Sequence, residues 1–156
     1  MWVAAIEDSL MSVFDFLFRS QRERVHAQIA PMLAMLLADG KPHPNEMKFI
    51  AMRLGELGVP PSEFEQMLRN PPKFVPPSAR DQRLRILVET ALVMLADGSV
   101  DPSEMALFVG LTHRLELTGE EAGLALLAAR ELMKRLQPGS DLDSEITTAL
   151  TTLGSR

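Results

Sequence analysis

The eleven residues LADGKPHPNEM at positions 37–47 return at positions 95–105 as LADGSVDPSEM, and seven of the eleven are identical. In both copies an apolar stretch ends in Asp-Gly, and a Pro-x-Glu sequence opens the next apolar stretch. A glycine after one helix and a proline at the start of another are typical of a helix-turn-helix unit. The sequence therefore predicts that one such unit occurs twice in the chain.

Apolar residues recur at helical spacing almost everywhere, and no segment shows the strict alternation of a half-buried strand. We therefore predict an all-α fold, a single compact helical domain of about seven to eight helices built from two pseudo-repeated halves. The first repeat spans about 25–69 and the second about 83–127. Between them lies the stretch NPPKFVPPS at 70–78, whose four prolines favour an extended linker.

The rest of the chain extends this core at both ends. We predict an N-terminal amphipathic helix over 1–20, ahead of a helical domain that covers 21–156. The sequence Thr118 to Glu121 is typical of a capping box, and it predicts a long helix that stops before Pro138. A final helix ends near residue 153.

Each predicted helix carries an apolar stripe that we expect to face the core. The stripes comprise Ile29, Leu33, Leu36 and Leu37 in the second helix, Met47, Ile50, Ala51, Leu54 and Leu57 in the third, and Met105, Phe108, Val109 and Leu115 after the second motif.

Charge, cysteine content and hydropathy limit the classes of partner and the cellular location that we expect for this protein. Sixteen basic and twenty-one acidic residues give a net charge of −5 with no cationic run, which argues against a nucleic-acid partner. The absence of cysteine fits a reducing compartment. We find no signal-peptide pattern and no apolar run of the ~20 residues that a spanning helix needs, so we expect a cytoplasmic protein.

The spacing Gly-x5-Glu at 40–46 and 98–104 matches the second half of a calcium-binding EF-hand loop. The first half does not fit, because two ligand positions fall on apolar residues of the preceding helix, Met35 and Leu37 in the first copy. We therefore reject an EF-hand.

Helix capping explains most of the motif without a ligand. The glycine suits a left-handed position after a helix, the proline suits the first helical position, and the glutamate suits the third position of a capping box. These residues are Gly40, Pro44 and Glu46 in the first copy and Gly98, Asp101, Pro102 and Glu104 in the second, where Asp101 is a good N-cap.

Capping leaves Asp39 and Asp97 unexplained. Each would lie at the C-terminal end of a helix, where a carboxylate meets the negative end of the helix dipole at a cost of ~0.3–1 kcal/mol. The compensating partner could be the amides of the next helix, a basic side chain or a metal ion. If the two loops approach one another, they would form an oxygen-rich site suited to Ca²⁺, Mg²⁺ or Mn²⁺. The candidate metal ligands are Asp39, Glu46, Asp97, Asp101 and Glu104.

The repeated L-x-ADG-x3-P-x-E core, with the LGVPPSEFEQML turn and helix that follow its first copy, resembles the TerB-like domains of tellurite-resistance proteins and the N-terminal domain of DjlA-type co-chaperones. The resemblance covers about 25–136. It implies an all-helical domain of two related halves, an acidic loop suggested as a metal site, and a stress-linked interaction or sensing role. It points to Asp39 and Glu46 in the first copy, and to Asp97, Asp101 and Glu104 in the second. His43 and Lys41 in the first copy depart from the pattern.

Three scattered histidines and the lack of a phosphate-binding loop argue against an enzyme. We expect a non-enzymatic module that binds a protein partner under the control of a divalent cation at the acidic loops. A purely structural or self-associating protein is the alternative. The N-terminal helix could pack on the core, self-associate or touch a membrane. Its acidic polar face, with Glu7, Asp8 and Asp15, makes membrane contact the least favoured of the three.

Overall fold

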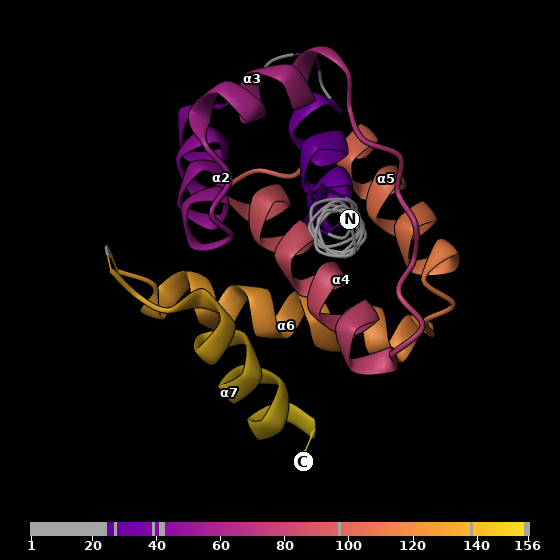
Figure 1. Cartoon of the computed structure of the whole chain (residues 1–156). Helices are drawn as coiled ribbons and strands as arrows, with labels where there is room; N and C mark the ends of the chain where they lie inside the picture. The colour runs from indigo at the N-terminus through magenta and orange to yellow at the C-terminus, as the bar shows by residue number, and fades with distance from the viewer. Residues whose placement is uncertain are drawn as a thin grey trace, which may run out of the picture.

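The computed structural model describes residues 25–154 except 27, 39, 41, 42, 97 and 138. Within that part of the chain every regular element is a helix and there is no strand, so the all-α prediction is confirmed there (Figure 1). A helical segment at 28–37 is followed by six numbered helices. They are α2 (Pro44–Glu56), α3 (Pro61–Arg69), α4 (Arg80–Leu95), α5 (Pro102–Arg114), α6 (Gly119–Arg135) and α7 (Leu142–Gly154).

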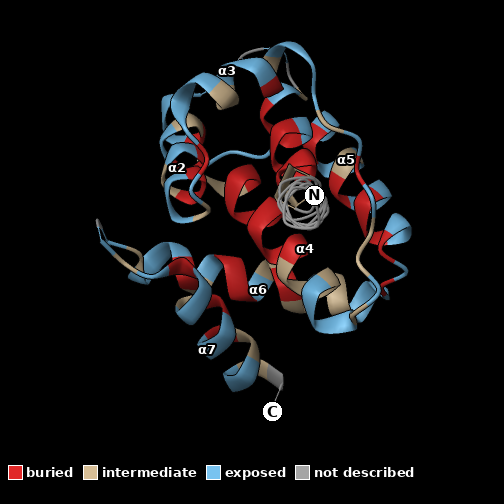
Figure 2. Cartoon of the chain, in the orientation of Figure 1, coloured by how far each residue is buried: buried red, intermediate tan, exposed pale blue. Residues whose placement is uncertain are grey.

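Helix α4 is the centre of the molecule. Nine consecutive residues, from Ile86 to Met94, are buried, and α4 contacts α2, α5 and α6 (Figure 2). A helix that is buried all round needs neighbours on every side. Helix α6 crosses α4 and also contacts α7, so α7 joins the body of the protein at one edge (Figure 1).

The loops of the two motifs end and begin helices as the sequence predicts. Gly40 has φ 76° and Gly98 has φ 82°, the left-handed conformation that glycine adopts without steric cost. Helices α2 and α5 begin at Pro44 and Pro102, and each has 13 residues. The capping box that opens α6 is also present, because the Thr118 and Glu121 side chains each accept the other residue's backbone N–H.

The ends of α2 and α5 share one hydrogen-bond pattern. Val59 N–H donates to the Leu54 carbonyl at 2.9 Å, and Leu117 N–H donates to the Thr112 carbonyl at 3.1 Å, 58 residues later. The residue before each donor is left-handed, and in the second copy it is Glu116 with φ 55°. The two turns are therefore closed in the same way even where the glycine is not kept.

The proline-rich linker is not helical over 71–77, as predicted. Arg114 holds it against α5: its Nη2 donates to the Phe74 carbonyl at 3.3 Å, and its guanidinium lies 5.0 Å from the centre of the Phe74 ring. At the other end Arg83 Nε donates to the Pro77 carbonyl at 2.6 Å. These contacts bind the linker to α4 and α5.

Four predicted core positions are wrong. Leu37 and Ala51 are exposed, and on α5 the side chains of Met105 and Val109 are 39% and 49% exposed. On α5 the physical reason is that the buried residues, such as Phe108 and Leu111, lie on one face and Met105 and Val109 on the other, so its apolar residues cover a wider arc than the core can accept. The other members of the three stripes are buried or half-buried.

The predicted N-terminal helix over 1–20 lies outside the described residues. Among those that are described, no helix combines the length and the apolar character needed to cross a membrane.

Candidate functional site

The predicted metal ligands divide into three groups in the structure. Asp39 and Asp97 lie outside the described residues. Glu46 and Glu104 are each only 2% exposed, at the third positions of α2 and α5. Asp101 is exposed at the N-cap of α5.

The second motif forms the capping box that its sequence predicts. Asp101 Oδ1 accepts the Ser103 backbone N–H at 2.8 Å, and Glu104 Oε1 accepts the Asp101 N–H at 3.2 Å. Hydrogen bonds from the Ser103 hydroxyl and backbone lower the pKa of Asp101. In the first motif His43 takes the place of Asp101, and its Nδ1 accepts the Asn45 N–H at 3.1 Å. Each loop therefore begins its helix with a side-chain cap.

Among the described residues, no three His, Asp or Glu side chains form a group that could hold a metal ion. Because Asp39 and Asp97 are not among those residues, the pooled loop site remains a hypothesis. A site at either loop would have to include the aspartate of that loop.

A different group of charges, absent from the sequence predictions, lies between α2, α4 and α7. Arg53 of α2 is 3% exposed, and its Nη2 donates to Glu89 Oε1 of α4 at 2.6 Å. The same Nη2 lies 2.9 Å from Asp143 Oδ1 of α7. We call Arg53, Glu56, Arg85, Glu89 and Asp143 the ion cluster.

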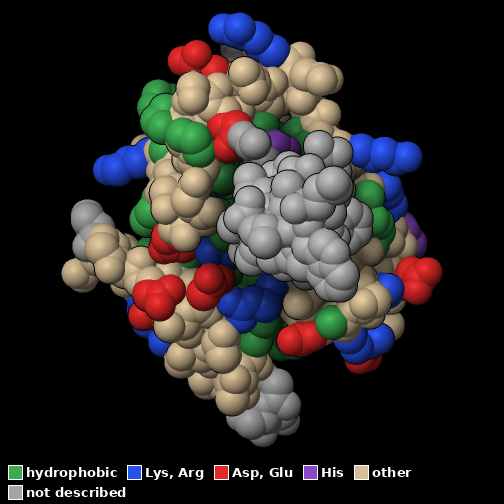
Figure 3. All heavy atoms as spheres, in the orientation of Figure 1, with side chains coloured by type: hydrophobic (Ala, Val, Ile, Leu, Met, Phe, Trp, Pro, Cys, Tyr) green, Lys and Arg blue, Asp and Glu red, His purple; other side chains and the backbone are tan. Residues whose placement is uncertain are grey.

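The ion cluster fixes the start of α7. Glu56 accepts Arg53 Nη1 with one oxygen, at 3.1 Å, and the backbone N–H of Leu142 with the other, at 3.2 Å. Arg85 Nη2 donates to both the backbone carbonyl and Oδ1 of Asp143, at 3.0 Å each. Acidic and basic side chains accordingly adjoin one another near α7 in Figure 3. The first residues of α7 are thus held by side chains of two other helices.

Burial and pairing compete within the cluster. Burial raises the pKa of Glu89 to about 7, and the neighbouring Arg53 charge only partly opposes it. For Asp143, burial acts to raise the pKa, but the hydrogen bonds and charges of Arg53 and Arg85 outweigh it and the pKa is lowered. Glu89 is therefore the carboxyl group of this cluster that changes charge near neutral pH.

A cavity of about 340 Å³ adjoins the cluster, and its polar lining consists of Arg53, Arg85, Glu89 and Asp143 together with Gln28, Asp81 and Gln82. The four cluster members among these residues are already paired with each other. The arrangement favours a structural clamp for α7 over a site that presents unpaired charges to a ligand.

Two charged residues within apolar stretches of the sequence could have indicated the ion cluster. Glu89 interrupts the apolar run of α4, and Arg53 lies between Met52 and Leu54 on the stripe of α2. The position 58 residues after Arg53 is Leu111, which is also buried. An opposite charge on the core face of each of two helices indicates a buried ion pair, whereas the repeat alone predicts an apolar residue.

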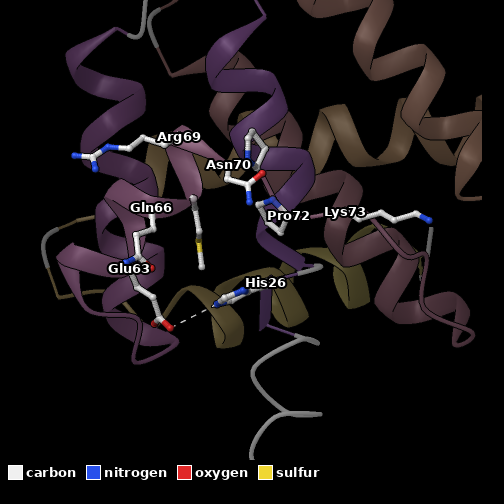
Figure 4. Close-up of a pocket in the computed structure, with 9 residues that line it drawn as sticks. His26, Glu63, Gln66, Arg69, Asn70, Pro72 and Lys73 are labelled. Carbon is white, nitrogen blue, oxygen red and sulfur yellow. Dashed lines mark ion pairs between the residues drawn. The ribbon is translucent and has the colours of Figure 1, made fainter.

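A second hollow, of about 750 Å³, is lined by His26, by residues of α3 and by the start of the linker. His26 Nε2 and Glu63 Oε1 point toward one another across it at 3.8 Å (Figure 4). Arg69 and Lys73 extend away in opposite directions, so the charges of this hollow do not converge on one point (Figure 4).

The pKa of Glu89 predicts an unusual pH dependence. A carboxyl group whose folded pKa lies above its ordinary value of 4.5 stabilises the fold fully below pH 4.5, and this contribution is lost as the pH rises through about 7. We expect the free energy of unfolding to fall between pH 5 and 7 more steeply in the wild-type chain than in Glu89→Gln. Denaturant titrations at several pH values measure both slopes.

Asp143 does not contribute to these slopes between pH 5 and 7. Its pKa is lowered in the folded state, so its titration affects the free energy of unfolding only below the ordinary carboxyl pKa of 3.8. The exposed Glu65→Gln variant is the control and should keep the wild-type slope. Equal slopes for Glu89→Gln and the wild type would contradict the prediction.

Comparisons with protein families, with curated proteins and with solved structures find no match to this chain.

Proposed function

We propose that this protein is a non-enzymatic helical module of the TerB-like kind, which binds a protein partner in a stress-linked interaction or sensing role. We further propose that a divalent cation at the acidic loops controls the binding. The observation that carries the proposal is that Glu46 and Glu104, one behind each loop, are both almost completely buried.

A buried carboxylate loses hydration, and the surrounding groups must compensate for that loss. Both glutamates occupy the third position of a helix, six residues beyond a left-handed glycine that directly follows the aspartate of the motif. Carboxylate oxygens are the ligands that Ca²⁺, Mg²⁺ and Mn²⁺ prefer. The second copy is the better candidate, because Asp101 adds a third carboxylate where the first copy has His43.

The shared geometry of α2 and α5 supports a fold of two related halves. The helices have equal lengths, begin at equivalent prolines and end in the same turn 58 residues apart. We infer that the two loops are copies of one cation-binding loop. The second copy has more carboxylate ligands than the first.

Calorimetric titration with Ca²⁺, Mg²⁺, Mn²⁺ and Zn²⁺ tests the cation. We expect heat and a higher melting temperature with one of the first three ions in the wild-type chain, and neither in Asp97→Asn/Glu104→Gln. The Asp97→Asn single variant keeps the capping box of α5, so its loss of binding cannot be attributed to a broken helix start.

The matched control is Glu65→Gln/Glu120→Gln, which removes the same number of charges at exposed positions and should bind like the wild type. If none of the four ions gives heat or a thermal shift in the wild-type chain, the cation part of the proposal is wrong.

The alternative is a structural or scaffolding protein that acts by self-association without any ligand. The exposed apolar residues of α5, Met105 and Val109, favour it. It predicts assembly of the chain with itself and no response to cations.

A further inference from the structure

The outer face of α5 is a continuous stripe with little charge. Its members are spaced three and four residues apart, which places them on one side of a helix, and all of them are exposed. They are Pro102, Met105, Ala106, Val109, Gly110 and His113. Apolar helix surface of this kind usually meets a partner.

The stripe is complementary to itself when two copies of α5 run antiparallel. With the twofold axis between residues 107 and 108, Met105 of one copy lies opposite Gly110 of the other, and Val109 lies opposite Ala106. Each large side chain therefore faces a small one. A Cβ added at Gly110 would meet no atom within 4 Å, so the space above this glycine is open in the monomer.

The charges at the ends of the stripe also match. Asp101 is exposed at the start of α5, and the exposed His113 lies in its last turn beside Arg114, whose guanidinium also contacts Phe74. An antiparallel pair places Asp101 of each copy beside the basic end of the other. Complementary charges of this kind favour one orientation over the other.

We propose that α5 of this chain pairs antiparallel with α5 of a second copy through this stripe. The proposal rests on the interaction role given above and names a second copy as the partner. A closed twofold pair is the commonest form of homo-oligomer, and it uses the same patch on both subunits.

The equivalent face of α2 does not offer the same surface. Lys48 occupies the position that Ala106 holds in α5, and Met47 and Met52 are partly packed on the core. Pairing through α2 would bury a lysine of each copy in the contact, so of these two helices α5 is the better dimer surface. Because one helix face is small, we expect a weak, concentration-dependent dimer of the class that buries less than about 1,200 Å².

Sedimentation of the full chain over a range of concentrations tests the pairing. We expect a monomer–dimer equilibrium in the wild type, and a dimer at least tenfold weaker in Val109→Glu, in Ala106→Lys and in Gly110→Leu. His113→Glu, which puts a carboxylate opposite Pro102 and close to Asp101 of the other copy, should weaken the dimer as well. Leu127→Glu is the matched control, because Leu127 is an equally exposed leucine on α6 and should not affect the dimer.

Melting of each variant at low concentration separates assembly from folding, and Gly110→Leu should melt no lower than the wild type because a Cβ added there meets no atom within 4 Å and glycine is a poor helix former. A wild-type chain that stays monomeric at every concentration overturns the inference. A dimer that survives Val109→Glu and Ala106→Lys, or is broken by Leu127→Glu, overturns it too. None of these results bears on the cation titration, so the two proposals fail independently.

Discussion

Replacing Arg53 by methionine should lower the free energy of unfolding by about 3–5 kcal/mol at pH 8, where Glu89 is ionised. Methionine fills a similar volume, but it leaves the Glu89 carboxylate buried without its 2.6 Å guanidinium partner. It also removes the hydrogen bond to Glu56 and the contact with Asp143, both of which hold the start of α7. Urea denaturation followed by circular dichroism measures the loss.

The double variant Arg53→Met/Glu89→Leu separates the cost of an unpaired charge from the value of the pair. Replacing both partners of a buried ion pair by apolar side chains is often neutral or stabilising. We therefore expect the double variant to recover most of the stability that Arg53→Met loses. Lys134→Met is the control, because its ion pair with Glu131 is exposed and should contribute less than about 1 kcal/mol. A loss in Arg53→Met no larger than that of the control would show that the ion cluster is not a clamp.

The helices of this protein were predictable because their ends depend on interactions between residues that are close in the sequence. Pro44, Pro102 and the Thr118–Glu121 pair open helices, and Gly98 closes one, through contacts within a few residues. The linker followed from its prolines alone. These features depend on local backbone preferences, which can be inferred from the residue types of a single sequence.

The side of a helix that faces the core was harder to predict. Val109 and Phe108 are adjacent apolar residues, yet Phe108 is buried and Val109 is half exposed. The choice depends on where α4 and α6 lie, which helical periodicity does not specify when apolar residues cover most of the helix surface.

The ion cluster was missed for a related reason. Arg53 and Glu89 are 36 residues apart, and each looks like an exposed charge in its own segment. Only the packing of α2 on α4 shows that both are buried. The candidate metal ligands Glu46 and Glu104 were placed correctly at the third positions of their helices, and the capping box of Glu104 was correct, but their almost complete burial is again a property of the packed molecule.

Leu132→Ala is the second substitution expected to have a large effect. Leu132 is fully buried on α6, the helix that contacts both α4 and α7. Truncating a buried leucine removes its transfer free energy and leaves a cavity, which together lower the free energy of unfolding by about 2–5 kcal/mol. Thermal and denaturant unfolding measure the change.

The neighbouring residue provides the control. Met133 is 38% exposed, so Met133→Ala removes a similar number of atoms from a site that solvent already reaches. We expect its effect to be less than half that of Leu132→Ala. Equal losses for the two variants would contradict the assignment of the core face of α6.

The clamp on α7 also bears on the order in which the molecule is completed during synthesis. Glu56 and the Leu142 amide that it binds are 86 residues apart. When α2 and α4 have emerged from the ribosome, the nascent chain already contains Arg53 and Glu89. It still lacks the Asp143 carboxylate and the start of α7, which complete the cluster. The contacts that Leu142 and Asp143 make with the cluster therefore form only after α7 has been translated.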